Sequence, residues 1–583
     1  MKGRGLSIAI VSAFFVVCAV VIYLAVGRSK SPDQPSLAAS ATASGAVAAG
    51  DKKPSGPSVE IVVSSSDGKK EWIEDVARSF EATKASVGDK PIKVKLIHMK
   101  SGESMQKVLD GKEKPHIWSP AGGSWIDLIN TTWKTRTGHA FIDNPQPTVM
   151  SGLVIAMWEP MAQALGWPSK PVGWEEIFKV AADPKGWATY KHPEWGAFRF
   201  GHSHPDFSTS AMLSVMSSIY AVAGKTSGLT VDDLKNPKII DRVGALERSI
   251  VHYGESSSWM TEKLCTKGPA YLSAVTLYES SVVSANDKFK AQMPFKLVAI
   301  YPKEGTFWEN HPSGVVQADW VTPEHKQAAE KFLAFMSTKD QQAKAPKYGY
   351  RPTDPSVPLA SPIDEAHGVN PKQTNANALE VPSQDIFSRA QELWHKVKKH
   401  STVYMLLDTS GSMQEKGKMA AAKKGAASFI RAMEKDDEIS VITFSTDVRT
   451  LRPVAPVREV GEVLATQVEG LFAEGQTAMY DATILAMEEI EKAKKRPDGA
   501  IRLYGIVLLS DGKDTSSKKS LNDLKDRMPS TEAADGTRLF TVAYGDDADG
   551  DLLKQLADRS NARFLKGNAD NIEKVYHQIS AYF

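Results

Sequence analysis

Apolar and polar positions alternate along residues 58–398 in blocks that predict strands followed by helices. An apolar strand pattern over residues 59–63 breaks at three serines, and a helical pattern follows it over residues 71–83. Further strands are predicted over residues 92–99, 116–118, 150–158, 271–283 and 295–301, and a closing helix over residues 384–398. Strands that alternate with helices indicate an α/β fold with parallel sheets, whose functional loops lie at strand ends.

The last third of the chain shows the same alternation with acidic residues at the strand ends. The apolar run 403–407 is followed by Asp408-Thr409-Ser410-Gly411-Ser412 and then by a helical pattern over residues 419–433. A second apolar run, 506–509, ends in Ser510-Asp511-Gly512. Ligands bind parallel sheets outside the carboxyl ends of strands, and Mg²⁺ prefers oxygen ligands in octahedral geometry. The pattern therefore predicts that oxygen atoms converge on a divalent cation.

Asp-x-Ser-x-Ser, a loop threonine and Ser-Asp-Gly after a strand, in this order, resemble the von Willebrand factor type A (VWA) family over about residues 401–583. The resemblance implies a Rossmann-like domain with a metal-ion-dependent adhesion site that binds a protein partner. The implied metal is Mg²⁺, with Mn²⁺ or Ca²⁺ as alternatives, and the implied ligands are Asp408, Ser410, Ser412, Thr477 and Asp511. Alternatively, Asp408 and Ser412 only cap a helix.

Polar turns between residues 58 and 398 resemble bacterial extracellular solute-binding proteins, in the style of the branch that includes molybdate binders. They are Ser65-Ser66, Ser101-Gly102, Trp118-Ser119-Pro120, residues 205–210, Tyr278-Glu279-Ser280 and residues 299–306. The resemblance implies a two-lobed periplasmic-binding-protein-like module whose cleft closes on a small polar solute. The candidate ligand-binding residues are Ser65, Ser66, Ser101, Ser208 and Glu279.

Helix N-termini and serine hydroxyls at these turns suit an anion, because both offer hydrogen-bond donors. Glu279 argues against a simple oxyanion, since a carboxylate repels one. The other interpretation is that the serines only cap helices.

The N-terminal segment 6–27 has 22 residues without a charge. About 20 apolar residues span a bilayer, whereas a secretory signal has a shorter apolar region. We favour an uncleaved transmembrane anchor over a removed signal. The predicted organisation is an anchor at residues 1–30, a flexible Ala/Ser/Gly/Pro linker at 31–57, the solute-binding-like domain at 58–398 and the VWA domain at 399–583. All 13 tryptophans lie between Trp72 and Trp394, which supports a boundary near residue 400.

Composition narrows the function classes. The formal net charge of +2 gives no indication of nucleic-acid binding.

A disulfide between Cys18 and Cys265 is not expected, because Cys18 lies in the apolar segment. His202-x-His204 lacks a third zinc ligand with recognisable spacing, and Asp547-x-Asp549-x-Asp551 lacks the glycine and glutamate of a calcium loop. Asp549 is instead predicted to cap a helix.

The sequence favours a binding protein over an enzyme, since no catalytic motif is visible. The first hypothesis is a membrane-anchored, single-pass protein, mostly outside the cytoplasm, that binds a polar solute in its cleft and a protein at its metal site. The second is an extracytoplasmic hydrolase that uses the cleft, with the VWA domain recruiting substrate. The third is a channel component, although one apolar span per chain makes a poor pore.

Overall fold

The computed structural model describes residues 57–583, except residues 207, 252, 255, 375–376, 529–535 and 581. The predicted anchor at residues 6–27 and nearly all of the predicted linker lie outside these residues. No helix within the described part of the chain is long and apolar enough to cross a membrane.

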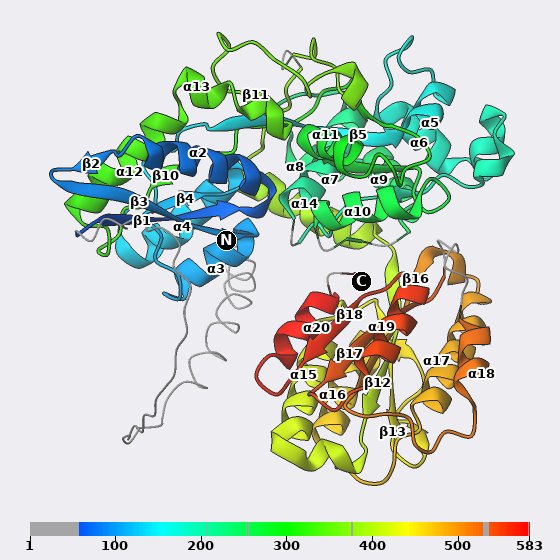
Figure 1. Ribbon diagram of the computed structural model, residues 1–583. Coiled ribbons are helices and arrows are strands. Elements are labelled where there is room, and N and C mark those ends of the chain that lie inside the picture. Colours follow the sequence, from blue (N-terminus) through cyan, green and yellow to red (C-terminus); the bar gives the residue numbers. More distant parts are fainter. Residues whose placement is uncertain are drawn as a thin grey trace, which may run out of the picture. The chain divides into compact units, whose positions relative to one another are not determined.

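The first α/β lobe is built on a five-stranded sheet (Figure 1). Its order is β10 (Gly314–Val315), β4 (Ile117–Ser119), β1 (Val59–Ser66), β3 (Lys90–Met99) and β2 (Ser86–Val87). The central strand β1 runs parallel to both β3 and β4, while β10 and β2 are antiparallel to their neighbours. The strands predicted over residues 59–63, 92–99 and 116–118 are thus confirmed.

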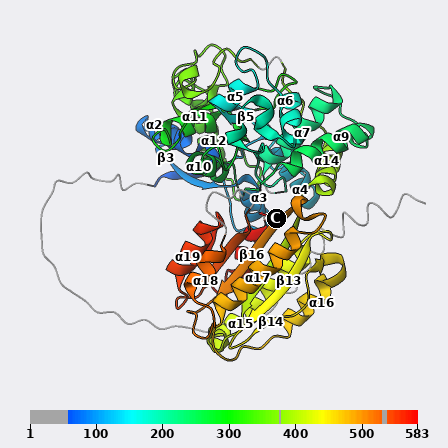
Figure 2. The same ribbon diagram turned by 90° about the vertical axis from the view of Figure 1, so that its right-hand side faces the viewer.

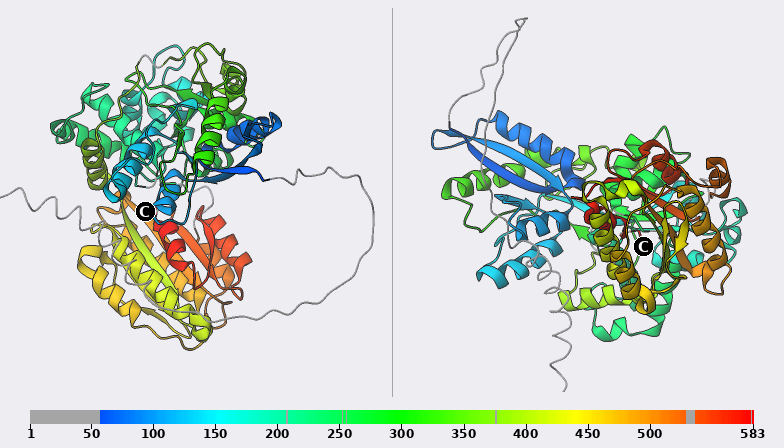
Figure 3. Two further views of the ribbon diagram at one scale, coloured as in Figure 1. Left: turned by 90° about the vertical axis from the view of Figure 1, so that its left-hand side faces the viewer. Right: turned by 90° about the horizontal axis from the view of Figure 1, so that it is seen from below.

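Helices cover both faces of this sheet, and their positions can be followed in Figure 3. On one face lie α2 (Lys70–Ala82) and α12 (Pro323–Met336), and on the other α3 (Ser101–Leu109) and α4 (Gly123–Thr137). Phe80 of α2 meets Phe332 of α12 edge to face, with ring centroids 5.2 Å apart. β1 is therefore covered on both faces; apart from the exposed Glu60 near its start, its polar residues are the three serines at its carboxyl end.

The second lobe is organised around the long strand β5 (Val149–Trp158). β5 pairs antiparallel with four strands, and β6 (Phe200–Gly201) extends the sheet beyond β7. The four partners are β7 (Ala274–Tyr278), β8 (Leu297–Ile300), β9 (Trp308–Glu309) and β11 (Arg351–Pro352). The larger helices of the lobe are α6 (Trp174–Ala182), α7 (Thr209–Ala223), α9 (Pro237–Arg248), α10 (Ser257–Lys267), α11 (Glu279–Lys288) and α14 (Gln384–Val397). Shorter helices are α5 (Glu159–Ala164) and α8 (Val231–Leu234), whereas α13 (Lys339–Gln342) follows and contacts α12 of the first lobe.

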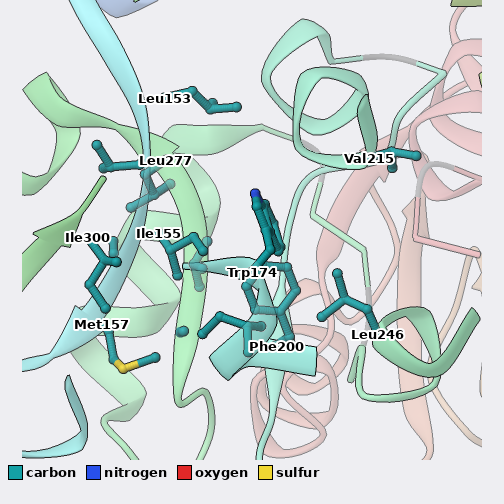
Figure 4. Close-up of a cluster of buried hydrophobic side chains, with 14 of the residues drawn as sticks. Leu153, Ile155, Met157, Trp174, Phe200, Val215, Leu246, Leu277 and Ile300 are labelled. Atoms are coloured by element: carbon teal, nitrogen blue, oxygen red, sulfur yellow. The ribbon is translucent and has the colours of Figure 1, made fainter. Parts of the chain in front are cut away.

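Figure 4 shows how apolar side chains fill the core of this lobe. Leu153 and Ile155 of β5 and Leu277 of β7 lie in one cluster with Trp174 of α6 and Val215 of α7. All five are at most 2% exposed. Burial of such side chains is the main favourable contribution to the folding of a domain.

The strand predicted over residues 271–283 is wrong in its second half. The strand β7 ends at Tyr278, and α11 begins at Glu279. The buried residues of α11 include Val282, Val283 and Asn286, which recur at the three-to-four-residue spacing of a helix face. An apolar run that spans the strand and the first helical turn does not reveal where one ends and the other begins.

The C-terminal domain has a largely parallel sheet, seen in Figure 2. The order is β14 (Val448–Thr450), β13 (Glu438–Phe444), β12 (His400–Asp408), β16 (Arg502–Ser510), β17 (Arg538–Tyr544) and β18 (Phe564–Gly567), and β15 (Ala455–Pro456) pairs with β13. Helices α15 (Lys418–Ala432), α16 (Val457–Glu469) and α20 (Ile572–Ser580) pack on one face. Helices α17 (Met479–Lys494), α18 (Leu521–Arg527) and α19 (Gly550–Arg559) pack on the other.

The order of the strands places a topological switch at β12. The chain passes from β12 to β13 on one side and later to β16 on the other, and both pairs are parallel. The loops that follow neighbouring strands therefore diverge at the carboxyl end of β12. Open α/β sheets bind ligands at such a point.

Candidate functional site

The predicted metal site lies at the switch point of the C-terminal sheet. Asp408 is the last residue of β12, and Asp511 directly follows β16; both are 0% exposed. Oδ1 of Asp408 accepts a hydrogen bond from the backbone N–H of Ser410 at 2.9 Å, and Oδ2 accepts one from Oγ of Ser510 at 2.7 Å. These bonds hold the carboxylate of Asp408 toward the loop that follows β12.

Hydroxyl groups connect the two aspartates. Oγ of Ser410 lies 3.0 Å from Oγ of Ser412, which donates to Oδ1 of Asp511 at 2.7 Å. The loop that carries Thr477 meets the first loop where the N–H of Gly411 donates to the carbonyl of Gly475 at 3.0 Å. A Cβ atom at Gly512 would lie 4.0 Å from Oγ1 of Thr477. The structure thus brings all five predicted residues to one place.

The charge at this site is negative and partly compensated. Burial, reinforced by the charge of Asp511, raises the pKa of Asp408, and the hydrogen bonds from Ser410 and Ser510 oppose the rise. Nζ of Lys418, the first residue of α15, donates to Oδ2 of Asp511 at 2.7 Å. Two buried carboxylates with neighbouring hydroxyls are a donor set that suits a hard divalent cation. The ammonium of Lys418 occupies one carboxylate oxygen that such a cation would use.

Sequence reasoning did not identify Lys418. Its position at the start of the helical pattern indicated only that it belongs to a helix. Positive charge is unfavourable at a helix N-terminus, so the helix itself does not explain a lysine there. The bond to Asp511 explains its place, because the acidic strand end of β16 lies beside the start of α15.

A second candidate site is a cavity of about 480 Å³. Residues of both lobes line it, from β1–α2 and α3–α4 of the first lobe and from α7, α10 and α11 of the second. Two pairs of side chains join the lobes beside it. Nε1 of Trp125 donates to Oγ1 of Thr209, and Nζ of Lys288 lies 2.7 Å from the carboxylate of Glu71. This is a cleft between two lobes that touch across it.

Three of the five predicted ligand-binding residues line this cavity: Ser66, Ser101 and Ser208. Oγ of Ser66 is buried and has no hydrogen-bond partner. Oγ of Ser101 accepts the N–H of Ala121 at 2.9 Å, and Oγ of Ser208 lies 3.0 Å from Oγ of Ser210. Among the three, Ser66 is the one whose hydroxyl has no hydrogen-bond partner.

The structure places the other two, Ser65 and Glu279, outside the residues that line the cavity. Successive side chains of a strand point to opposite faces, so Ser65 points away from the face that Ser66 uses. Its hydroxyl donates to the backbone carbonyl of Ser66 at 3.3 Å. Glu279 is fully buried and accepts two hydrogen bonds from the guanidinium of Arg351, at 2.8 and 2.6 Å. Its charge is thereby compensated inside the protein.

Sequence reasoning did not assign Lys69, Tyr278 or His311 to the ligand site, although Tyr278 stands in one of the polar turns that it singled out. Lys69 stands three residues after Ser66, and Tyr278 directly precedes Glu279, so their strand-end positions were a signal. His311 follows the short strand β9 and carried no such signal. It has a φ of 41°, in the left-handed region that is uncommon for residues other than glycine.

The weaker candidates of the sequence have internal partners. Nε2 of His202 lies 3.1 Å from Oε1 of Glu247, whose other oxygen accepts hydrogen bonds from Tyr253 and Trp394. No group of three His, Cys, Asp or Glu side chains in the described residues is arranged for a metal ion. The predicted cap is confirmed, because Oδ1 of Asp549 accepts the N–H of Leu552 at 3.1 Å.

Comparison with protein families agrees with this architecture. Residues 61–351 match the family described as bacterial extracellular solute-binding protein. Residues 402–578 match the von Willebrand factor type A domain. The chain therefore carries a solute-binding domain followed by a VWA domain, as the sequence motifs predicted.

Individual relatives are distant. Inter-alpha-trypsin inhibitor heavy chain H4 of Sus scrofa is 25% identical over 200 residues, which cover 33% of this chain and 21% of that protein. An uncharacterized protein of Synechocystis, sll0103, is 29% identical over 179 residues, which cover 31% of this chain and 40% of that protein. The chain thus spans less than half the length of these relatives.

Solved structures of both kinds of domain are similar to parts of the chain. A von Willebrand factor type A protein from Catenulispora acidiphila has 20% identity and a TM-score of 0.28, covering 32% of this chain and 42% of that one. An ABC transporter substrate-binding protein from Bradyrhizobium japonicum has 13% identity and a TM-score of 0.41, covering 58% of this chain and 99% of that one.

The buried carboxyl of Glu309, in β9, predicts a pH dependence of stability. Glu309 is buried against Gly122, where a Cβ atom would lie 2.3 Å from Oε2. Burial raises its pKa to about 7, against a smaller opposing effect of the N–H of Gly123. A carboxyl whose pKa is raised in the folded state makes its full contribution to stability at a pH below its pKa in the unfolded chain. This contribution is lost as the pH rises through the folded-state pKa of about 7.

We expect Glu309→Gln to remove this loss. Relative to wild type, the variant should gain up to about 3 kcal/mol between pH 4 and pH 8, measured by denaturant unfolding at several pH values. Glu60→Gln, a change at an exposed carboxyl of β1, is the control and should follow wild type. Parallel pH profiles of wild type and Glu309→Gln would contradict the assignment.

Proposed function

We propose that this protein is a membrane-anchored, extracytoplasmic binding protein with two sites. The solute-binding domain takes a small polar solute in the cleft between its lobes, and the VWA domain takes a protein partner through a divalent metal. The observation that carries the proposal is the convergence of Asp408, Ser410, Ser412 and Asp511 at the switch point of the VWA sheet. The apolar segment 6–27 is the proposed anchor.

The metal would be Mg²⁺, with Mn²⁺ or Ca²⁺ as alternatives. Asp408 and Asp511 would supply negative charge, and Ser410, Ser412 and Thr477 would bind directly or through water. Magnesium commonly keeps several waters rather than a full shell of protein ligands. A partner Asp or Glu could displace one of these waters, which joins recognition to a charge-assisted bond.

The competing proposal is a hydrolase that uses the cleft. Nucleophilic catalysis by a serine needs a base within hydrogen-bond reach. None of the described hydroxyls that line the cavity has a histidine as its hydrogen-bond partner; Ser66, for example, has no partner. This geometry favours binding over covalent catalysis.

The metal site is tested with Asp408→Ala. Titration of the purified full-length chain with MgCl₂ or MnCl₂ by calorimetry should show binding in wild type and none in the variant. The fold should persist, because Asp408 lies at the end of β12 and not among its core positions. Equal affinities of wild type and variant would contradict the site.

Lys418→Met tests the electrostatics of the same site. The ammonium competes with a cation for Oδ2 of Asp511, so its removal should tighten metal binding about tenfold, or about 1.4 kcal/mol. The control is Lys424→Met, on the same helix but paired with Glu573. If Lys418→Met weakened metal binding, Lys418 would instead be needed to hold Asp511 in place.

Partner binding should depend on the metal. Proteins captured from membrane extracts by the full-length chain should require Mg²⁺ or Mn²⁺, be released by a chelator, and be lost with Asp408→Ala. Partners that remain bound equally well in chelator would show that the VWA domain recognises them through another surface.

Solute binding is tested by thermal shift of the full-length chain against small polar compounds. A solute that binds the folded state raises the melting temperature by linkage. Ser66→Trp should abolish the shift, because the indole would fill the cavity beside Ser66. Its melting temperature without solute shows whether the variant is folded. A shift that persists in the folded variant would place the solute elsewhere.

A further inference from the structure

The inner end of the cleft contains a buried lysine without an acidic partner. Lys69 is 0% exposed, and Nζ donates to the carbonyl of Pro120 at 2.8 Å. An ammonium group has three hydrogens to donate. No carboxylate of the described residues lies within ion-pair distance of Lys69. Burial lowers the pKa of the Lys69 amine well below its usual range, because the charged form has no acidic partner, so a bound anion would favour that charged form.

Neighbouring polar groups of the cavity are also without partners. Ser66 is 4% exposed and His311 is 2% exposed; Oγ of Ser66 and both ring nitrogens of His311 have no hydrogen-bond partner. The buried hydroxyl of Tyr278 has none either. Buried polar side chains in native structures are nearly always hydrogen-bonded. Three such side chains on one cavity, with four unpartnered polar atoms between them, therefore indicate a missing ligand rather than three separate exceptions.

Helix N-termini point to the sign of the ligand's charge. The first residues of α3 and α7 line the cavity, as do Ser280 and Ser281 in the first turn of α11, and the N-caps of these helices make no side-chain capping bond. The N–H groups and the partial positive charge of helix N-termini favour an anion, although in α11 the N–H of Ser280 already donates to Oγ of Ser151. The acidic lining residues Asp67, Glu71 and Glu262 are exposed, in contrast to Lys69.

The size of the cavity argues for more than a bare oxyanion. A water molecule takes up about 30 Å³ of liquid volume, so a tetrahedral oxyanion of roughly two or three times this size fills a minor part of the cleft. The cavity measures about 480 Å³ and is also lined by the rings of Trp125, Tyr278 and Tyr350. Aromatic rings supply contact surface for the body of a ligand and a few polar groups fix its orientation.

We propose that the cleft binds a small organic anion, a carboxylate or a phosphate monoester, whose oxyanion group is held by Lys69, Ser66 and His311. The body of the ligand packs against Trp125, Tyr278 and Tyr350. This assignment rests on the proposed solute-binding function and specifies its ligand class. It also gives the buried ammonium the counter-charge that the described protein residues do not supply.

The test compares charged probes with neutral ones on the full-length chain. The pairs are malonate with malonamide and glycerol 3-phosphate with glycerol, extended to larger carboxylates and phosphate monoesters, with inorganic phosphate as the bare oxyanion. An organic anion should raise the melting temperature, while its neutral counterpart and inorganic phosphate should not. Which of the two series binds distinguishes a carboxylate from a phosphate ligand.

Lys69→Met should weaken the binding anion at least tenfold, and the exposed, adjacent Lys70→Met should leave it unchanged. Without ligand, Lys69→Met should be at least as stable as wild type, because it removes an uncompensated buried charge. Ser66→Ala is a smaller change in the same group and should weaken binding without disturbing the fold.

Three results would overturn the proposal: an organic anion bound equally well by Lys69→Met, inorganic phosphate binding as tightly as any organic anion, or no anion of either series binding. A neutral solute that shifts wild type but not Ser66→Trp would overturn the anion assignment and leave the binding function standing. Absence of binding by charged and neutral compounds alike would count against both.

Discussion

A strand buried on both faces of a sheet can carry polar groups only where it leaves the core, and both candidate sites depend on this constraint. In β12, Met405 and Leu407 pack with α15, α16 and α20, while Tyr404 and Leu406 pack with α17 and α19. The first charged position after these residues is Asp408, at the carboxyl end. In the first lobe, the buried positions of β1 are apolar until its serines, and Ser66 is the serine of β1 that lines the cleft. The layered packing that stabilises each domain therefore also positions its functional groups.

The two sites carry opposite charges, and their compensation differs. At the VWA site two buried aspartates lie together, and Lys418 neutralises part of their charge. In the cleft, Lys69 is buried with a carbonyl as its hydrogen-bond partner. The carboxylate of Glu279 is also buried, and its charge is compensated by Arg351. Buried charges with internal partners serve the fold, whereas those without them are the better candidates for ligand contacts.

The contacts across the cleft connect ligand binding with the arrangement of the lobes. Trp125 of α4 reaches Thr209 of α7, and Nζ of Lys288 in α11 lies 2.7 Å from the carboxylate of Glu71 in α2. These residues also line the cavity. A ligand that fills the cavity would contact the same elements that hold the lobes together, and so would favour the state in which they touch.

The sequence by itself determined the α/β class, the order of the two domains and the composition of the VWA site, because these depend on local patterns. Apolar runs marked β1, β12 and β16, and polar residues at or directly after their carboxyl ends were assigned by position. Parallel pairing then brings such strand ends together without further information. Local patterns did not separate β7 from α11, since one apolar run covers both.

Only the tertiary structure decided which polar groups find partners. Glu279 and Lys69 have similar positions near strand ends, yet Arg351, 72 residues later in the chain, neutralises the first, and no described side chain neutralises the second. Lys418 meets Asp511 because α15 begins beside the end of β16, a contact between residues 93 positions apart. His311 reaches the cleft from a short loop with no motif of its own. Long-range pairing of charges depends on the packing of whole elements, which no local pattern contains.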